Sequence, residues 1–178
     1  MKTKLTTLLL AITFFSFSQR TVVSTSSVEI TRPADATAYA AFDAVASSST
    51  APTILTFSNI NPSSFQNCYI TKAKLFTDQS ANTARFRLGI YISSVTAVND
   101  NAQQTLLYAN NGIKIGSIDF DACSTEGTGS TGAASLNTTI RLPFLISGTT
   151  IYALLETLDA FTPASGQKFW IELTTDCN

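Results

Sequence analysis

Residues 85–93 constrain the fold of this chain more than any other stretch. Apolar residues occupy every second position there (Phe86, Leu88, Ile90 and Ile92), and two arginines, a glycine and a tyrosine lie between them. Successive side chains of a β-strand point to opposite faces of a sheet. The alternation therefore predicts a strand with one face in a core and the other toward solvent or a neighbour. A slip of one residue would expose every apolar side chain in it.

The same period of two continues through most of the chain from residue 21 onward, and turn-forming residues separate short apolar stretches. Residues 105–110 fit either a helix or a strand. Imperfect alternation in residues 68–77 indicates a β-bulge, and Trp170, between two apolar neighbours, is expected in the core. The expected strands cover residues 21–31, 42–46, 53–57, 68–77, 85–93, 113–120, 137–146, 150–157 and 168–174.

Many short strands at this spacing predict an all-β fold, specifically a jelly-roll-like, two-sheet antiparallel sandwich. Residues 121–136 are rich in Gly, Ser, Thr and Ala. Such a segment has little to pack, so we expect an exposed loop there, with a functional loop as the alternative.

The composition argues against enzymes and nucleic-acid-binding proteins. The chain has no histidine, which removes the commonest general base and metal ligand. Its 11 basic and 12 acidic residues give a net charge of -1 and form no basic stripe for phosphates. Only 13% of residues are charged, so uncharged polar groups must cover the surface. We therefore expect a non-enzymatic protein without catalytic residues, cofactor or metal, and without a nucleic-acid partner.

The first residues read as a secretory signal peptide. Lys2 and Lys4 precede an apolar stretch over residues 5–17, and small residues at Ser16 and Ser18 fit cleavage before residue 19. The alternative is a retained arm that binds a capsid or a neighbouring subunit. On either interpretation, residues 1–27 are separate from a β-sandwich domain of residues 28–178.

Three cysteines, Cys68, Cys123 and Cys177, lie far apart and lack the paired spacing of a zinc site. The spacing favours three ordinary thiols. One disulfide with one free thiol is the alternative for a protein that meets an oxidising compartment.

Several other groups admit a functional interpretation, but each has a simpler structural one. Asp119 and Asp121 offer only two carboxylates to calcium, which takes six or more oxygen ligands. Glu156, Asp159 and Glu172 could form a glycosidase pair, although solvated surface charge fits them better.

Two further features are weaker still. Residues 137–139 match the glycosylation sequon, a frequent chance pattern. A sugar-binding platform or protein interface could use the aromatic residues Tyr39, Tyr69, Tyr91, Tyr108, Tyr152 and Trp170. No site residue is assigned from any of these groups.

Segments matching in order along residues 28–178 resemble the capsid decoration (auxiliary head) proteins of tailed bacteriophages. Arg32-Pro33 with Asp35, Thr37 and Tyr39 matches an Arg-Pro-x-Asp/Asn-x-Thr-x-Tyr stretch of that family. The other matching segments are residues 42–45, 55–60, 70–76, 86–91, 96–102, 116–120 and 161–165.

This resemblance implies a structural protein on the capsid surface of the virion. Its partner would be the lattice of the major capsid protein. It would form a homo-oligomer, with a trimer at three-fold positions preferred, and a host-surface glycan is a further candidate partner. The signal-like leader and the 121–136 stretch depart from the family. They support the alternative of a secreted bacterial surface adhesion or carbohydrate-binding module.

Overall fold

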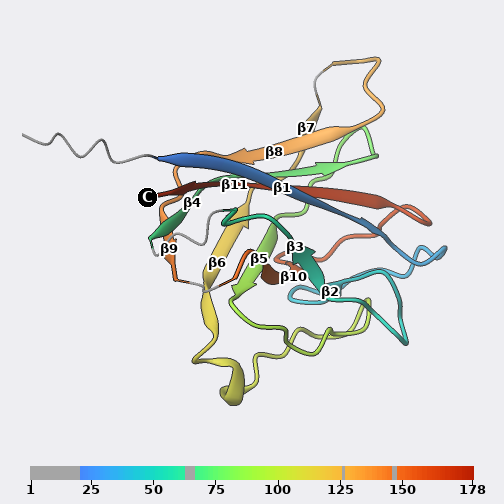
Figure 1. Ribbon diagram of the computed structural model, residues 1–178. Helices are drawn as coiled ribbons and strands as arrows, with labels where there is room; N and C mark the ends of the chain where they lie inside the picture. The colour runs from blue at the N-terminus through green and yellow to red at the C-terminus, as the bar shows by residue number, and fades with distance from the viewer. Residues whose placement is uncertain (1–20, 63–66, 126, 146–147) are drawn as a thin grey trace, which may run out of the picture.

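The computed structural model describes residues 21–62, 67–125, 127–145 and 148–178, and in them no helix is long and apolar enough to cross a membrane. The fold is a sandwich of two antiparallel sheets stacked one above the other (Figure 1). The predicted two-sheet, all-β architecture is confirmed. Of the predicted leader or arm, residues 1–20, with the cleavage point before residue 19, lie outside the described residues.

The first sheet has six strands in the order β1-β11-β4-β8-β7, with β9 also pairing with β4. The second has five strands in the order β2-β10-β5-β6, with β3 also pairing with β10. The strands are β1 (Val22–Thr31), β2 (Ala44–Val45), β3 (Leu55–Phe57), β4 (Cys68–Thr77), β5 (Phe86–Tyr91), β6 (Lys114–Phe120), β7 (Ser124–Thr125), β8 (Ala133–Asn137), β9 (Leu142–Phe144), β10 (Ile151–Thr157) and β11 (Lys168–Cys177).

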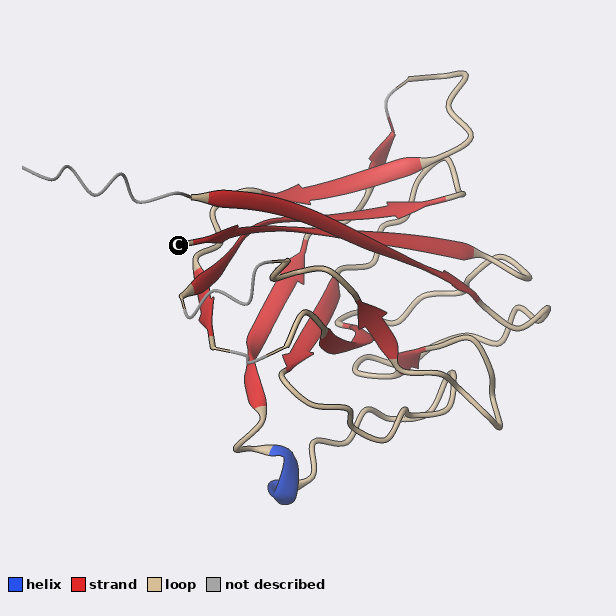
Figure 2. Ribbon diagram, viewed as in Figure 1, coloured by secondary structure: helices blue, strands red, loops and turns tan. Residues whose placement is uncertain are grey.

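β1 begins at Val22, opposite Cys177 of β11, and the two strands pair without interruption to Thr31. The sequence-based boundary between residues 27 and 28 therefore falls inside this strand. The stretch of residues 105–110, which fits helix or strand, contains a single 3-10 turn, η1 (Tyr108–Asn110). It lies at the lower end of the molecule, below the five-stranded sheet (Figure 2).

Alternating apolar residues from both sheets meet in one core. Phe86 of β5 is fully buried and packs edge-on against Phe169 of β11 and Phe161, with ring centroids 5.2 and 5.7 Å apart. Burying a side chain of this size stabilises the fold by about 1.5–3 kcal/mol. The alternation predicted for residues 85–93 is confirmed at Phe86, Leu88 and Ile90.

Two aromatic residues differ in burial from what the alternation predicts. Trp170 points outward and is only partly buried, because Phe169 and Ile171 take the core-facing positions of β11. Tyr91 is 3% exposed, although its position faces outward. Its ring lies over Gly89, where a Cβ would come 3.3 Å from the tyrosine hydroxyl.

The bulge predicted in residues 68–77 is confirmed in β4. Thr174 of β11 pairs with Lys72 and Thr175 pairs with Ile70, so Thr71 has no opposite residue. The extra residue changes which alternate residues of β4 face the core, from even-numbered to odd-numbered positions. Cys68 and Ile70 face the core before it, and Ala73 and Leu75 after it.

The expectation of an exposed loop at residues 121–136 holds for residues 127–131 but is wrong for the end of the segment. This segment contains β7 and most of β8, which pairs with β4 from Ala133 to Asn137. Ala133 is fully buried. Small side chains fit here because the strand packs closely, and at Gly132 a Cβ would lie 2.3 Å from the Phe76 ring.

Candidate functional site

The connection between β5 and β6 carries the candidate site, and Asp100 anchors it to the core. The Asp100 carboxylate accepts a hydrogen bond from Arg32 Nη2 at 3.0 Å and one from the Tyr39 hydroxyl at 2.5 Å. It also accepts the backbone N–H of Ala46 at 2.9 Å. Arg32 Nε in turn donates to the Tyr39 hydroxyl. We call Arg32, Tyr39 and Asp100 the buried charge network.

Each member of this network comes from a different loop at one end of the sandwich. Arg32 directly follows β1, and its Nη1 donates to the carbonyl of Ala164 at 3.4 Å. Tyr39 stacks on Phe161 with ring centroids 5.1 Å apart, and the two backbones form an isolated β-bridge. Segments that carry the sequence resemblance, around residues 32–39, 96–102 and 161–165, therefore meet here.

The network is almost wholly removed from water. The side chains of Arg32 and Asp100 have 0% and 2% relative exposure. Burial alone would lower the pKa of Arg32, but the contacts with Tyr39 and Asp100 outweigh it and the pKa is raised. Burial, together with Asp100, also raises the pKa of Tyr39. A charge in such a place is tolerated only with its partner, so the network fixes the β5–β6 connection at Asp100.

Backbone hydrogen bonds extend this anchoring on both sides of Asp100. Its N–H donates to the carbonyl of Ser48, and the N–H of Asn101 donates to that of Ala44. Further along, the N–H of Gln104 donates to the carbonyl of Phe42, which holds a left-handed backbone (φ 69°). A bulky residue rarely adopts this conformation, so the surrounding bonds hold it in place.

Beyond this fixed base, the connection presents three consecutive large apolar side chains to solvent. Leu106, Leu107 and Tyr108 are 46%, 53% and 94% exposed, and we call them the apolar tip. The N–H groups of Asn110 and Asn111 donate to the carbonyls of Leu107 and Tyr108, which shapes the tip into the η1 turn. The tip is therefore a formed turn on an anchored loop, able to bind an apolar surface.

The three carboxylates that could form a glycosidase pair, and for which surface charge is the preferred interpretation, do not all lie on one sheet. Glu172 lies on β11, whereas Glu156 lies on β10 in the other sheet. Asp159 accepts hydrogen bonds from Arg85, which lower its pKa to about 2. Arg87 Nη1 lies 4.0 Å from Glu156 Oε1, and burial raises the pKa of Glu156.

Of the two carboxylates considered for calcium, Asp119 already has an arginine partner. Arg87 donates to both oxygens of Asp119, at 2.7 and 2.9 Å, and this pairing lowers the Asp119 pKa. Within the described ranges, no group of three or more Asp, Glu, His or Cys residues could hold a metal ion. The Asn137 amide of the sequon donates to the Asp119 carbonyl at 3.0 Å.

The six aromatic residues do not form one platform. Tyr39 and Tyr91 are buried, and Tyr108 belongs to the apolar tip. The others lie on opposite sheets. Tyr152 is on β10, while Tyr69 and Trp170 are on β4 and β11, where Arg141 lies 4.5 Å from the Tyr69 ring and Lys74 lies 5.8 Å from that of Trp170.

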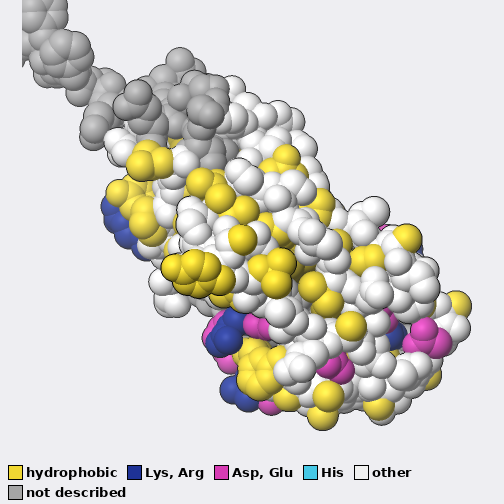
Figure 3. Space-filling view, turned by 90° about the horizontal axis from the view of Figure 1, so that it is seen from below, with side chains coloured by type: hydrophobic (Ala, Val, Ile, Leu, Met, Phe, Trp, Pro, Cys, Tyr) yellow, Lys and Arg dark blue, Asp and Glu magenta, His cyan; other side chains and the backbone are white. Residues whose placement is uncertain are grey.

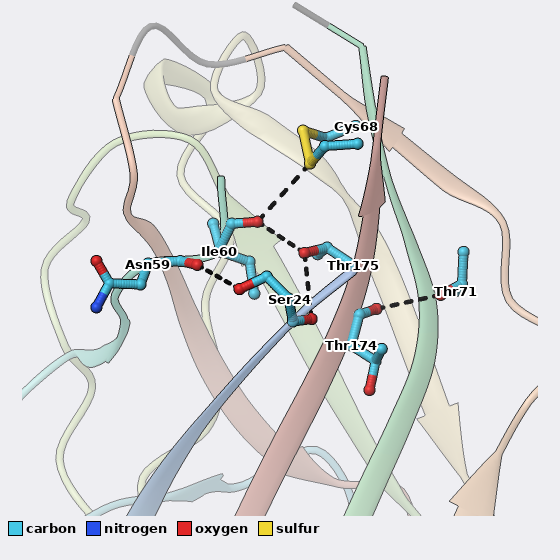
Figure 4. The surroundings of a disulfide bond; sticks show 8 residues. Ser24, Asn59, Ile60, Cys68, Thr71, Thr174 and Thr175 are labelled. Atoms are coloured by element: carbon cyan, nitrogen blue, oxygen red, sulfur yellow. Dashed lines mark hydrogen bonds between the residues drawn. A yellow bond between two sulfur atoms is a disulfide. The ribbon is translucent and has the colours of Figure 1, made fainter. Parts of the chain in front are cut away.

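The favoured interpretation of three free thiols is wrong. Cys68 and Cys177 form a disulfide that joins β4 to β11, and Cys123 is a buried free cysteine. Beside the disulfide, the Ile60 carbonyl accepts a hydrogen bond from the Thr175 hydroxyl at 2.7 Å (Figure 4). Cys68 and Cys177 lie directly opposite each other in the β4–β11 register, a relationship that sequence spacing does not reveal.

We expect Cys123 to be unreactive in the native protein. Burial raises the pKa of its thiol to about 11, so the reactive thiolate is scarce at neutral pH, and the sulfur is shielded. A colorimetric thiol assay without reductant should detect no thiol in buffer and one per chain in denaturant. Fast labelling of the native protein would contradict this.

Comparisons with known proteins add little to this geometry. No protein-family model and no curated protein matches the chain. A solved structure of turnip yellow mosaic virus matches with 10% identity and a TM-score of 0.28, covering 100% of this chain and 89% of that chain. The VP2 subviral particle of infectious bursal disease virus matches with 11% identity and a TM-score of 0.33, covering 90% and 34% respectively. Superposition at these TM-scores is poor, so the proposals below depend on the chain's own residues.

Proposed function

We propose that this chain is a non-enzymatic structural protein of a tailed-phage virion and that its apolar tip binds the exterior lattice of the major capsid protein. The observation that carries the proposal is the exposure of Leu106, Leu107 and Tyr108 on an anchored loop. Apolar side chains gain about 25 cal/mol for each Å² that a partner removes from water. Tyrosine is also frequent among the residues that dominate binding energies.

The lower end of the molecule, where the η1 turn lies, suits a protein contact. Figure 3 views the molecule from below and shows hydrophobic side chains among uncharged ones, with most acidic and basic side chains in the lower half of the picture. Charged residues are depleted at the centres of protein interfaces because their burial requires desolvation. The low charge content of the chain, 13%, is consistent with this use.

The sequence resemblance supports the same assignment. The segments that match the decoration proteins supply the buried charge network, which fixes the base of the tip. A lattice offers many equivalent sites, so modest single contacts act together when the protein is oligomeric. A trimer at three-fold positions, with the residues that precede β1 as a second contact, is the arrangement that we propose.

Replacing Leu107 and Tyr108 together by aspartate is expected to weaken capsid binding at least tenfold, which corresponds to about 1.4 kcal/mol. Both side chains are at least half exposed, so the free energy of unfolding should change little. The measurement is co-sedimentation of each purified variant with capsids of the source phage from which this protein has been stripped.

Leu136→Asp is the matched control. Leu136 is 54% exposed on β8, in the opposite sheet, and should tolerate the charge without loss of binding. Full binding by the double variant, or equal loss in the control, would contradict a contact through the tip.

A secreted surface adhesion or carbohydrate-binding module is the second candidate, and the Cys68–Cys177 disulfide favours it. Disulfides persist in oxidising compartments. The signal-like leader also favours a secreted protein. Mass spectrometry of purified virions and of culture supernatant separates the two candidates. Stoichiometric presence in virions supports the capsid role. A chain found only in the supernatant and starting at residue 19 supports the secreted module.

A further inference from the structure

The free edge of β1 is unlike the other edges of the sandwich. Protein sheets usually protect their edges with very short strands, charges, prolines or covering segments. β2, β3 and β7, which border their sheets, have two, three and two residues. β1 has ten residues, with no proline and no lysine, and no described strand pairs with its outer side.

The other long edge strand, β6, is covered. The side-chain amide of Asn137 donates to the Asp119 carbonyl of β6 at 3.0 Å. Leu142 of β9 packs against Gly116, where a Cβ would come 2.7 Å from a leucine methyl. Within the described ranges, β1 is thus the long edge that other strands leave open.

The side chains of β1 also indicate a missing neighbour. The five core-facing residues of β11 are buried, whereas Val22, Ser24, Ser26 and Val28, on the same side of β1, keep part of their surface exposed. A further strand beside β1 would cover this flank and use its free backbone groups. The occupant must therefore supply an extended segment with little charge.

We propose that the occupant is β1 of a second copy of this chain, paired antiparallel about a two-fold axis at Ser26. Both sandwiches then lie on the same side of one continuous sheet. On the core-facing side, Val22 meets Ile30 of the other copy and Ser24 meets Val28. Cross-strand pairs of β-branched residues stabilise sheets, and this register forms one at each end of the contact.

The outward-facing pairs are equally compatible. Val23 meets Glu29 and Thr25 meets Ser27, so no like charges oppose each other. Glu29 already has Lys168 as its ion-pair partner at 3.1 Å. A single strand pair is a small interface, so the dimer should form in a concentration-dependent way. The contact does not depend on the capsid role, because a secreted module would carry the same edge. Within a lattice, it would link copies from neighbouring oligomers.

A pair of charge variants tests the contact and its register together. Thr25 and Ser27 are both exposed. Both variants contain Ser27→Lys, and this lysine would lie opposite Glu172 of its own subunit, where its charge is favourable. Thr25→Lys with Ser27→Lys places like charges opposite each other across the axis. Thr25→Glu with Ser27→Lys places opposite charges there, and differs from the first variant at one residue.

Sedimentation velocity of the full chain over a wide concentration range is the measurement. The wild type should dimerise, the double-lysine variant should lose at least tenfold in affinity, and the glutamate–lysine variant should regain it. Oxidation of Ser26→Cys should trap a disulfide-linked dimer, because this residue lies on the axis, whereas Ser24→Cys should not.

Three results would overturn the proposal: a wild type that stays monomeric without trapping at residue 26, an oligomer unaffected by the two lysines, or dimerisation of the double-lysine variant alone. Capsid binding by the apolar tip is measured in a separate experiment. Failure of dimerisation through β1 would therefore leave the proposed capsid contact standing, and failure of capsid binding would leave the dimer standing.

Discussion

Replacing Asp100 by alanine is expected to lower the free energy of unfolding by about 3–5 kcal/mol, the usual result of leaving a buried charge without its partner. Arg32 would remain in the core with its side chain fully buried. The Tyr39 hydroxyl and the Ala46 N–H would lose their acceptor as well. Urea unfolding followed by tryptophan fluorescence gives the free energy, with Trp170 as the single reporter.

Asp35→Ala is the matched control, since Asp35 also faces Arg32. Its carboxylate lies 3.6 Å from Arg32 Nη2, but its side chain is 43% exposed. Exposed ion pairs contribute about 0–1 kcal/mol, so this variant should be nearly as stable as the wild type. Equal stability losses in the two variants would contradict a buried network centred on Asp100.

A double variant distinguishes the lost charge partner from lost packing. Arg32→Met with Asp100→Leu removes both charges and fills the space with apolar atoms. Such replacements of buried ion pairs are often neutral or stabilising. We therefore expect the double variant to be more stable than Asp100→Ala alone. A stability below that of the single variant would show that the charges themselves hold the loops together.

Removing the Cys68–Cys177 disulfide is expected to lower the free energy of unfolding by about 3–5 kcal/mol. The bond closes a loop with a sequence separation of 109, and long loops constrain the unfolded chain most strongly. Both cysteines are buried and lie in one cross-strand pair, so the folded state should accept serine with little rearrangement. Denaturant unfolding of Cys68→Ser with Cys177→Ser, under non-reducing conditions, measures the change.

Reductant provides the internal comparison. The wild type in reductant should unfold at the midpoint of the double-serine variant, and that variant should be insensitive to reductant. Cys123→Ala keeps the disulfide, so it should lose only the smaller amount expected of a conservative core change, about 1–1.5 kcal/mol. A wild type indifferent to reductant, while its disulfide is shown to be reduced, would contradict the prediction.

Alternation in the sequence predicted most of the sheet structure, since a period of two follows directly from strand geometry. It identified β5 through Phe86 and Leu88, and the break in the pattern of residues 68–77 correctly indicated the bulge at Thr71. It failed for residues 133–136, which belong to β8. There the strand is built from small residues that pack closely, and composition alone resembles that of a loop.

The buried charge network, by contrast, depends on contacts that are distant in sequence. Arg32 and Asp100 are 68 residues apart, and nothing local shows that they meet. The Arg-Pro pair after a strand was visible in the sequence, but its partner was not. The apolar tip did leave a signal, because two leucines and a tyrosine follow one another in a polar stretch.

The pairing of Val22 with Cys177 places the two ends of the described sandwich side by side, on neighbouring antiparallel strands. A pulling force applied between these ends would load the β1–β11 hydrogen bonds one after another, as in opening a zipper, and not all at once in shear. The disulfide resists such a load on the β11 side, because Cys177 is bonded covalently to β4. Tension on the segment before residue 22 would therefore peel β1 away first and leave the rest of the six-stranded sheet intact.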